Sequence, residues 1–147
     1  MITTTILPFS ELSIDILYDI LALRSEIFIV EQQCTYQDID YRDQKAQHLL
    51  VHEEGRLIAY ARILAYEDAY SMSFGRILII PSYRNKGLGK KLMTLILDYL
   101  DCHHSNRSIK ISAQHYLQIF YEGFGFVATS DPFDLDGIPH ILMVKQP

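Results

Sequence analysis

Residues 84–91 have the types and the order of an anion-binding loop. They read Arg-Asn-Lys-Gly-Leu-Gly-Lys-Lys, follow an apolar run at 77–80, and precede an apolar helical pattern that begins at Leu92. The start of a helix offers unpaired backbone N–H groups and the positive end of the helix dipole, and glycine lets an anion approach the backbone closely. A strand, a basic glycine-bearing loop and a helix in succession therefore predict a cradle for a phosphate group.

The distribution of charge supports a local anionic ligand. Residues 69–97 contain no Asp or Glu, but they hold five of the 13 basic residues of the chain: Arg76, Arg84, Lys86, Lys90 and Lys91. The whole chain is acidic, with 18 Asp and Glu residues and a net charge of −5. A basic patch on an acidic protein indicates one anionic ligand rather than a broad affinity for nucleic acid.

Length and composition predict one domain, residues 1–147, with 49% hydrophobic and 21% charged residues. No apolar run reaches the ~18 residues of a membrane span, and the first residues lack the basic start and apolar centre of a signal peptide. We therefore expect a cytoplasmic protein that does not contact membranes. The two cysteines, Cys34 and Cys102, provide neither a disulfide framework nor a four-ligand metal site, so we expect no metal.

The elements that must position the loop follow from hydrophobic periodicity and turn residues. Strands are expected over 2–7, 48–53, 56–66, 74–80, 109–113, 124–128 and 138–144, with loops at 31–43 and between the last two strands. Helices are expected from Ser10 or Ser13 to about Gln32, from Leu88 to about His103, and over 116–122. This order predicts an α/β fold, in which a mixed sheet carries helices on its faces.

Two separated motifs give the chain a family resemblance. Residues 84–89 match Arg-x-x-Gly-x-Gly after a strand that ends at Pro81, and residues 120–126, Phe-Tyr-Glu-Gly-Phe-Gly-Phe, are similar to Phe-Tyr-x-x-x-Gly-Phe. In this order and spacing they resemble the GNAT superfamily of acyl-CoA N-acyltransferases, and the segments 30–34, 36–40, 59–64 and 136–140 resemble its ElaA-like branch. The resemblance implies a GNAT-like fold, a mostly antiparallel mixed sheet of about six to seven strands flanked by about four helices.

The resemblance also implies a co-substrate, acetyl-CoA, and the residues that hold it. Backbone groups of Leu78, Ile79 and Ile80 would pair with the pantetheine arm in a cleft where strands 74–80 and 109–113 splay apart, and backbone N–H groups near Leu78 could polarise the thioester carbonyl. Gln114 falls where many members have an asparagine that contacts the cofactor arm. The pyrophosphate would lie on the loop formed by Arg84, Asn85, Lys86, Gly87, Leu88, Gly89 and Lys90.

Tyr121 matches the general acid of the family. Attack of an amine on a thioester releases a thiolate, and a phenol with a pKa near ~10 stays protonated at neutral pH and can protonate that thiolate. The alternative is a packing role, because the chain has ten tyrosines.

The general base is open between His115 and His140, and Glu31 and Asp38 are acidic alternatives that could instead bind a cationic amine. For each of these four residues a surface or hydrogen-bonding role is the competing interpretation. The acidic loops 31–43 and 131–136 could line an acceptor pocket or form solvated surface.

We therefore expect an N-acetyltransferase that moves an acetyl group from acetyl-CoA to a primary amine by direct attack in a ternary complex. The alternatives are an acyl-CoA-binding sensor and a structural module, both without turnover. The acceptor is expected to be a small molecule of unspecified identity. Many relatives dimerise, so the resemblance leaves a homodimer open.

Overall fold

A computed structural model describes the whole chain, residues 1–147, as two compact units. The first unit comprises Met1–Leu64 and Phe74–Tyr99, and the second comprises Ala65–Ser73 and Leu100–Pro147. Each unit is therefore built from two separate stretches of chain.

The strands of the first unit are neighbours in the order in which they occur along the chain. They are β1 (Ile2–Pro8), β2 (Gln47–Glu53), β3 (Arg56–Ala65) and β4 (Met72–Ile79). β1 and β3 both pair antiparallel with β2, so that Leu50 lies opposite Thr5 on one side and Tyr60 on the other. The end of β3 and the start of β4 extend into the second unit.

The first helix confirms one of the two expected starts. α1 (Ile14–Arg24) begins after Ser13, whose hydroxyl accepts a 3.1 Å hydrogen bond from the Ile16 N–H and so caps a free backbone donor. The helical path continues to Glu31, as expected, but its last part (η2, Ser25–Glu31) is a π-helix rather than an α-helix. Short 3₁₀ turns occupy Phe9–Glu11, Asp43–Lys45 and Pro81–Tyr83.

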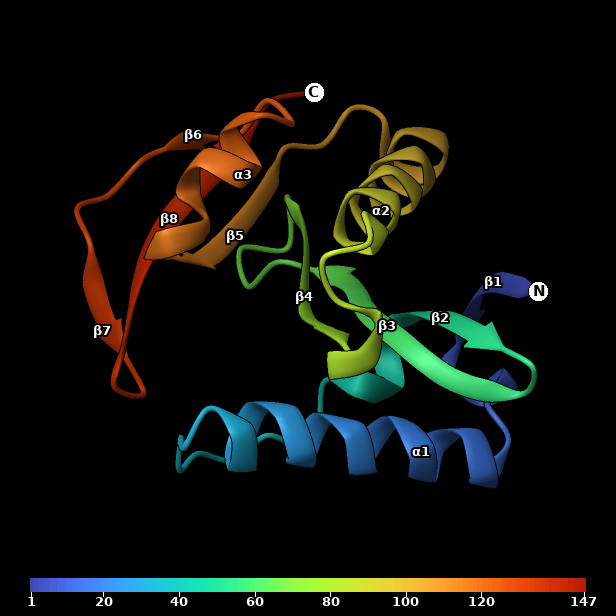
Figure 1. Cartoon of the computed structure of the whole chain (residues 1–147). Helices are drawn as coiled ribbons and strands as arrows, with labels where there is room; N and C mark the ends of the chain where they lie inside the picture. The colour runs from blue at the N-terminus through green and yellow to red at the C-terminus, as the bar shows by residue number, and fades with distance from the viewer. The chain divides into compact units, whose positions relative to one another are not determined.

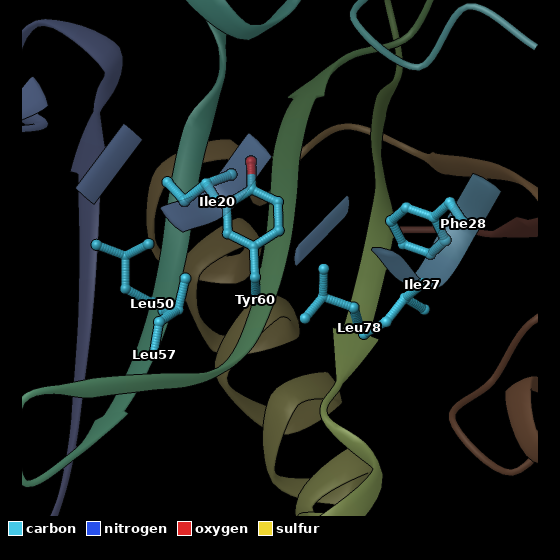
Figure 2. Packing of buried hydrophobic residues seen from close by; sticks show 7 residues of the cluster. All are labelled: Ile20, Ile27, Phe28, Leu50, Leu57, Tyr60 and Leu78. Atoms are coloured by element: carbon cyan, nitrogen blue, oxygen red, sulfur yellow. The ribbon is translucent and has the colours of Figure 1, made fainter. Parts of the chain in front are cut away.

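One face of α1 and η2 packs on β2, β3 and β4. The cluster comprises Ile20, Ile27, Phe28, Leu50, Leu57, Tyr60 and Leu78 (Figure 2). Every member is at most 8% exposed, so burial of these apolar side chains holds η2 against the strand that leads into the loop at 84–91.

The second helix, α2 (Leu88–His104), begins in the first unit and ends in the second. Leu92, Ile96 and Leu100, at helical spacing, are at most 2% exposed, which gives the helix its buried face. Figure 1 shows α1 along one side of β2–β4 and the first turns of α2 on the other side.

The second unit is centred on β8. It contains β5 (Ile109–Gln114), β6 (Val127–Ala128), β7 (Phe133–Leu135), β8 (Ile138–Lys145), a 3₁₀ turn at His115–Leu117 and α3 (Gln118–Glu122). β5, β6 and β7 all pair antiparallel with β8, and Met72 of β4 pairs parallel with Ile109 of β5.

The strand order, β1-β2-β3-β4-β5-β8-β6 with β7 on β8, confirms a mixed and mostly antiparallel sheet. Two details differ from expectation. There are eight strands because Phe133–Leu135, expected to be loop, folds back on β8, and there are three α-helices rather than about four. None of the helices combines the length and the apolarity needed to cross a bilayer.

Candidate functional site

The backbone of the loop before α2 is left-handed at two positions. Asn85 and Gly87 have φ angles of 62° and 80°, and α2 starts at the next residue, Leu88. A Cβ atom on Gly87 would meet nothing within 4 Å, so it is the left-handed backbone rather than crowding that favours glycine here. The unpaired N–H groups at the start of α2 therefore directly follow a turn with left-handed backbone angles, which most residue types adopt only with strain.

Side chains fix the entry to this loop. The Tyr83 hydroxyl donates to the Glu53 carboxylate, and the Lys86 ammonium lies 5.5 Å from the centroid of the Tyr83 ring. The basic residues that lie at the loop itself include Lys86, Lys90 and Lys91. Arg76, which the sequence places in the same basic stretch, instead forms ion pairs with Asp38 and Asp40.

The Arg84 side chain turns back from the loop. Its Nε donates to the Ile79 carbonyl at 2.8 Å, and its two terminal nitrogens donate to the two carboxylate oxygens of Glu31 at 2.8 and 2.7 Å. The hydrogen bonds from Arg84, with its positive charge, lower the pKa of Glu31. Glu31, expected as an acceptor-binding residue or base, therefore has a protein partner for both of its oxygens.

At the end of β4, where the cofactor arm is expected, some backbone groups are hydrogen-bonded within the protein and others face the outer edge of the strand. The Ile80 N–H donates to the Ile58 carbonyl at 3.0 Å, and the Ile80 carbonyl accepts from the Tyr83 N–H at 2.9 Å. Alternate residues of a strand direct their backbone groups to opposite edges, so those of Ile79 face the edge away from β3. Leu78, two residues before Ile80, directs its backbone groups to β3 as well, and its side chain is 2% exposed. Pairing of a cofactor arm with Leu78 or Ile80 thus finds no support in this hydrogen-bond pattern, and Ile79 has the suitable orientation.

The three aspartates of the acidic loop at 31–43 lie neither on solvated surface nor in an open pocket wall. They form ion pairs with arginines from α1, β3 and β4. Arg24, fully buried, contacts Asp38 at 3.0 Å and Asp43 at 2.7 Å. The remaining pairs are Arg62 with Asp40 and Asp43, and Arg76 with Asp38 and Asp40.

Asp38 is therefore a buried member of an ion-pair network, 9% exposed, and a role in binding an acceptor has no support. Burial opposes the ionisation of Asp40, but hydrogen bonds from Arg62 and its positive charge outweigh this and hold the pKa of Asp40 at about 2. His48 borders the network, with Nδ1 2.6 Å from the Tyr60 hydroxyl and Nε2 2.9 Å from the Asp43 carbonyl, and its burial lowers its pKa. The network joins the loop to the sheet.

Sequence reasoning overlooked the arginines of this network because their partners are remote along the chain. Arg24 carried one usable signal, since it lies four residues after Ile20 and four before Phe28, on the buried face of the helical path. A charged residue on such a face requires a buried counter-ion.

In the second unit, Gln114 and His140 lie opposite each other at the end of the β5–β8 ladder. His140 is half-buried and its Nδ1 is 2.7 Å from the Ile138 carbonyl, so that in the neutral ring Nδ1 carries the hydrogen and Nε2 has the lone pair. His115 directly follows Gln114 and is exposed.

Tyr121 is held in an aromatic cluster of the same unit. It is 8% exposed, and its ring meets Phe120 and Phe126 edge-on, with centroid distances of 5.3 and 6.0 Å. Burial, with a smaller contribution from Tyr116, raises the pKa of Tyr121 to about 12. The hydroxyl is therefore protonated across the physiological range, as a proton donor requires.

A pocket of about 260 Å³ lies in the first unit. It is lined by Glu26, Ile27, Val30, Glu31 and Pro81. Its walls thus combine apolar side chains with two carboxylates, at the point where η2 meets the turn that leads into the loop. No group of three or more His, Cys, Asp or Glu side chains is arranged to hold a metal ion.

Comparison with known proteins agrees with this arrangement. The family model described as acetyltransferase (GNAT) domain matches residues 20–147. Protein ElaA of Escherichia coli is 39% identical over 140 residues, which cover 93% of this chain and 92% of ElaA. The crystal structure of E. coli ElaA has a TM-score of 0.93 at 38% identity, covering 99% of this chain and 100% of that one. An acyl-CoA N-acyltransferase from Pseudomonas aeruginosa has a TM-score of 0.94 at 34% identity, covering 99% of each chain. The chain therefore belongs to the GNAT superfamily of acyl-CoA N-acyltransferases.

Proposed function

We propose that this protein transfers an acetyl group from acetyl-CoA to a primary amine by direct attack within a ternary complex. The observation that carries the proposal is the loop before α2, where Asn85 and Gly87 are left-handed, Lys86 lies between them, and the first turn of the helix carries Lys90 and Lys91 and no acid. Backbone N–H groups and positive charge together favour a pyrophosphate.

The cofactor arm would lie along the outward edge of β4. The backbone of Ile79 faces that edge, and an amide of the pantetheine arm would pair with it as an added half-strand. Leu78 directs its own N–H to β3, so an outward-facing backbone N–H beside it would then polarise the thioester carbonyl.

In the chemical step the amine nitrogen attacks the thioester carbonyl carbon, a C–N bond forms, and the C–S bond breaks. The departing thiolate takes the proton of the Tyr121 hydroxyl, which is later restored from water. Burial keeps the Tyr121 phenol protonated at neutral pH, so that a proton is available, but the raised pKa also makes it a weaker acid than a free tyrosine. The transfer therefore has to accompany cleavage of the C–S bond.

The amine must also lose a proton, and His140 is the better supported of the two candidate bases. The Ile138 carbonyl holds the Nδ1–H of His140 and so leaves the Nε2 lone pair to accept that proton. His115 is exposed and has no comparable orienting contact, and it stays the second candidate.

For the acceptor we propose an amine that reaches the pocket between η2 and Pro81. Glu31 is balanced by Arg84, whereas Glu26 is exposed and has no ion-pair partner, so the pocket favours an acceptor with positive charge and an aliphatic part. Asp38, buried among arginines, is withdrawn from this role.

The first test is calorimetric titration of the protein with acetyl-CoA, beside desulfo-CoA and with the Lys86→Glu/Lys90→Glu variant. We expect micromolar binding by the wild type and at least a tenfold loss in the variant, because each reversal puts an anion next to the pyrophosphate. A panel of amines, followed by release of the CoA thiol, then tests turnover. Binding without turnover on any amine would favour the sensor, and no binding by the folded protein would leave the structural role.

A further inference from the structure

The Arg84–Glu31 ion pair connects two parts of the first unit that the proposed reaction uses for different purposes. Arg84 opens the loop assigned to the cofactor, while Glu31 is the last residue of η2 and lines the pocket assigned to the acceptor. The two residues are 53 positions apart in sequence. We propose that Glu31 is a positioning residue that fixes Arg84, and through it the cofactor loop, in the conformation that receives acyl-CoA.

The geometry supports a positioning role because Arg84 is held by three directed contacts. The planar guanidinium presents two parallel N–H donors to the two oxygens of Glu31, at 2.8 and 2.7 Å, and this fork leaves the side chain little freedom to rotate. The third donor, Nε, reaches the Ile79 carbonyl at 2.8 Å. One side chain thus joins η2, the end of β4 and the start of the loop.

The contact between Arg84 and the Ile79 carbonyl lies at the place where the cofactor arm is proposed to bind. This carbonyl lies on the edge of β4 that faces away from β3, which is the edge proposed to pair with the cofactor arm. A carbonyl has two lone pairs, so it can accept from Arg84 and from a ligand amide together. Glu31 thereby determines where the guanidinium lies along the cofactor edge.

The exposure of the pair suits this role better than a role in stability. The side chains of Arg84 and Glu31 are 38% and 37% exposed, and ion pairs of this kind contribute little to folding. The buried aspartates of the acidic loop already hold that segment on the sheet. A pair that the fold hardly needs can be replaced without unfolding the protein.

This inference rests on the proposed function and makes a prediction about the sign of an effect. If Glu31 were only a negative charge near a phosphate site, its removal would strengthen binding of acetyl-CoA. If Glu31 positions Arg84, the Glu31→Gln variant should bind acetyl-CoA about threefold to tenfold more weakly, since an unfixed arginine must be ordered when the ligand binds. The two interpretations predict opposite changes.

The experiment is a double-mutant cycle on acetyl-CoA affinity, measured by calorimetry for the wild type and for the Glu31→Gln, Arg84→Gln and doubly substituted variants. We expect Glu31→Gln to have little further effect once Arg84 is replaced, which is the signature of a coupled pair. The Glu31→Asp variant keeps the charge but shortens the side chain, and it should lose part of the affinity. The matched control is Asp19→Asn, which neutralises an exposed carboxylate of α1 that has no ion-pair partner.

Additive effects in the cycle, or a Glu31→Gln variant that binds as tightly as the wild type or more tightly, would overturn the inference while leaving the proposed function intact. Failure of the folded wild type to bind acetyl-CoA would instead overturn the proposed function, and the inference with it. Thermal unfolding of each variant and of the control shows whether the protein is folded under the conditions of the titration. A change in affinity of a folded variant is then not due to loss of folded protein.

Discussion

The Asp43 carboxylate accepts a 2.7 Å hydrogen bond from the guanidinium of Arg24, which is fully buried. The same Asp43 oxygen also accepts from Arg62, at 2.9 Å. One buried carboxylate therefore bridges two buried arginines, each of which has one further partner, Asp38 for Arg24 and Asp40 for Arg62.

We expect the Asp43→Asn substitution to lower the free energy of unfolding by about 3 kcal/mol, because each of the two buried arginines loses one of its two counter-ions. Chemical denaturation of the two proteins measures the difference. The exposed Asp19→Asn control should change stability by less than ~0.5 kcal/mol. A loss of similar size in both variants would contradict the assignment of the network to the stability of the fold.

Stability should also fall in acid, and Asp40 should account for part of the fall. Its pKa of about 2 lies below that of an unfolded aspartate, about 4, so the unfolded chain takes up protons first as the pH falls. The stabilising contribution of Asp40 is therefore complete above about pH 4 and is lost as the pH drops toward 2.

Melting temperatures recorded between about pH 2 and 6 test this prediction. The Asp40→Asn variant should start from a lower melting temperature and show a shallower decline in acid, because the titrating group is absent. Parallel curves for the two proteins would assign the acid sensitivity to other carboxylates.

Replacement of Tyr121 by phenylalanine should affect turnover rather than binding. Loss of a positioned general acid costs about 10²–10³ in kcat, whereas the ring that packs on Phe126 is kept. The affinity for acetyl-CoA should stay within about twofold, since the hydroxyl is assigned to the leaving thiolate. The control is Tyr70→Phe, at an 81% exposed tyrosine of the same unit. Equal losses of turnover and affinity would rule out the role of Tyr121 as the acid.

The same substitution should change the response to alkaline pH. Burial raises the pKa of Tyr121 to about 12, above the value of about 10 expected in the unfolded chain. The unfolded chain therefore loses this proton first, and the contribution of Tyr121 to stability is complete below about pH 10 and declines above it. Between about pH 10 and 11 the wild type should lose stability faster than Tyr121→Phe. Identical slopes would show that the hydroxyl ionises as easily in the folded protein.

Alanine substitutions at two glycines can distinguish the cost of backbone strain from a specific effect of the loop on acetyl-CoA binding. Gly87 and Gly55 have φ angles of 80° and 81°, and an added Cβ would meet nothing within 4 Å at either position. Alanine should therefore cost about 1–2 kcal/mol of stability at both positions. Only Gly87→Ala should weaken binding of acetyl-CoA, since Gly55 lies in the β2–β3 turn. Unchanged affinity in Gly87→Ala would show that the cradle tolerates another backbone conformation.

The parts of the fold that sequence predicts well are those whose stabilising contacts are periodic and local. Leu92, Ile96 and Leu100 place α2 from Leu88 to within one residue of its end, because each buried contact repeats every turn. The loop before α2 could be predicted equally well from the sequence. Glycine there permits a left-handed backbone conformation, and the basic residues are neighbours along the chain.

Other parts depend on partners that the local sequence does not contain. β7 has only three residues between prolines, acids and a glycine, and it becomes a strand because β8 offers it a partner. The same holds for the acidic loop, where the segment itself contains only Arg42 as a positive residue while the balancing charges lie on α1, β3 and β4. The sequence likewise did not predict that the Arg84 side chain turns toward Glu31 rather than toward the loop, because the two residues are 53 positions apart.

The division of each unit into two stretches of chain has a consequence for synthesis. All residues of the first unit have been made once Tyr99 is added, so that unit can form while residues 100–147 are still absent. Residues 65–73, in contrast, belong to a unit whose other part begins at Leu100, and they must wait for the C-terminal stretch before they find their partners. The turn that holds Asp68 is therefore completed late, when β5 brings Lys110 to it at 2.9 Å. Shortening the chain at its C-terminus would thus expose a segment in the middle of the sequence.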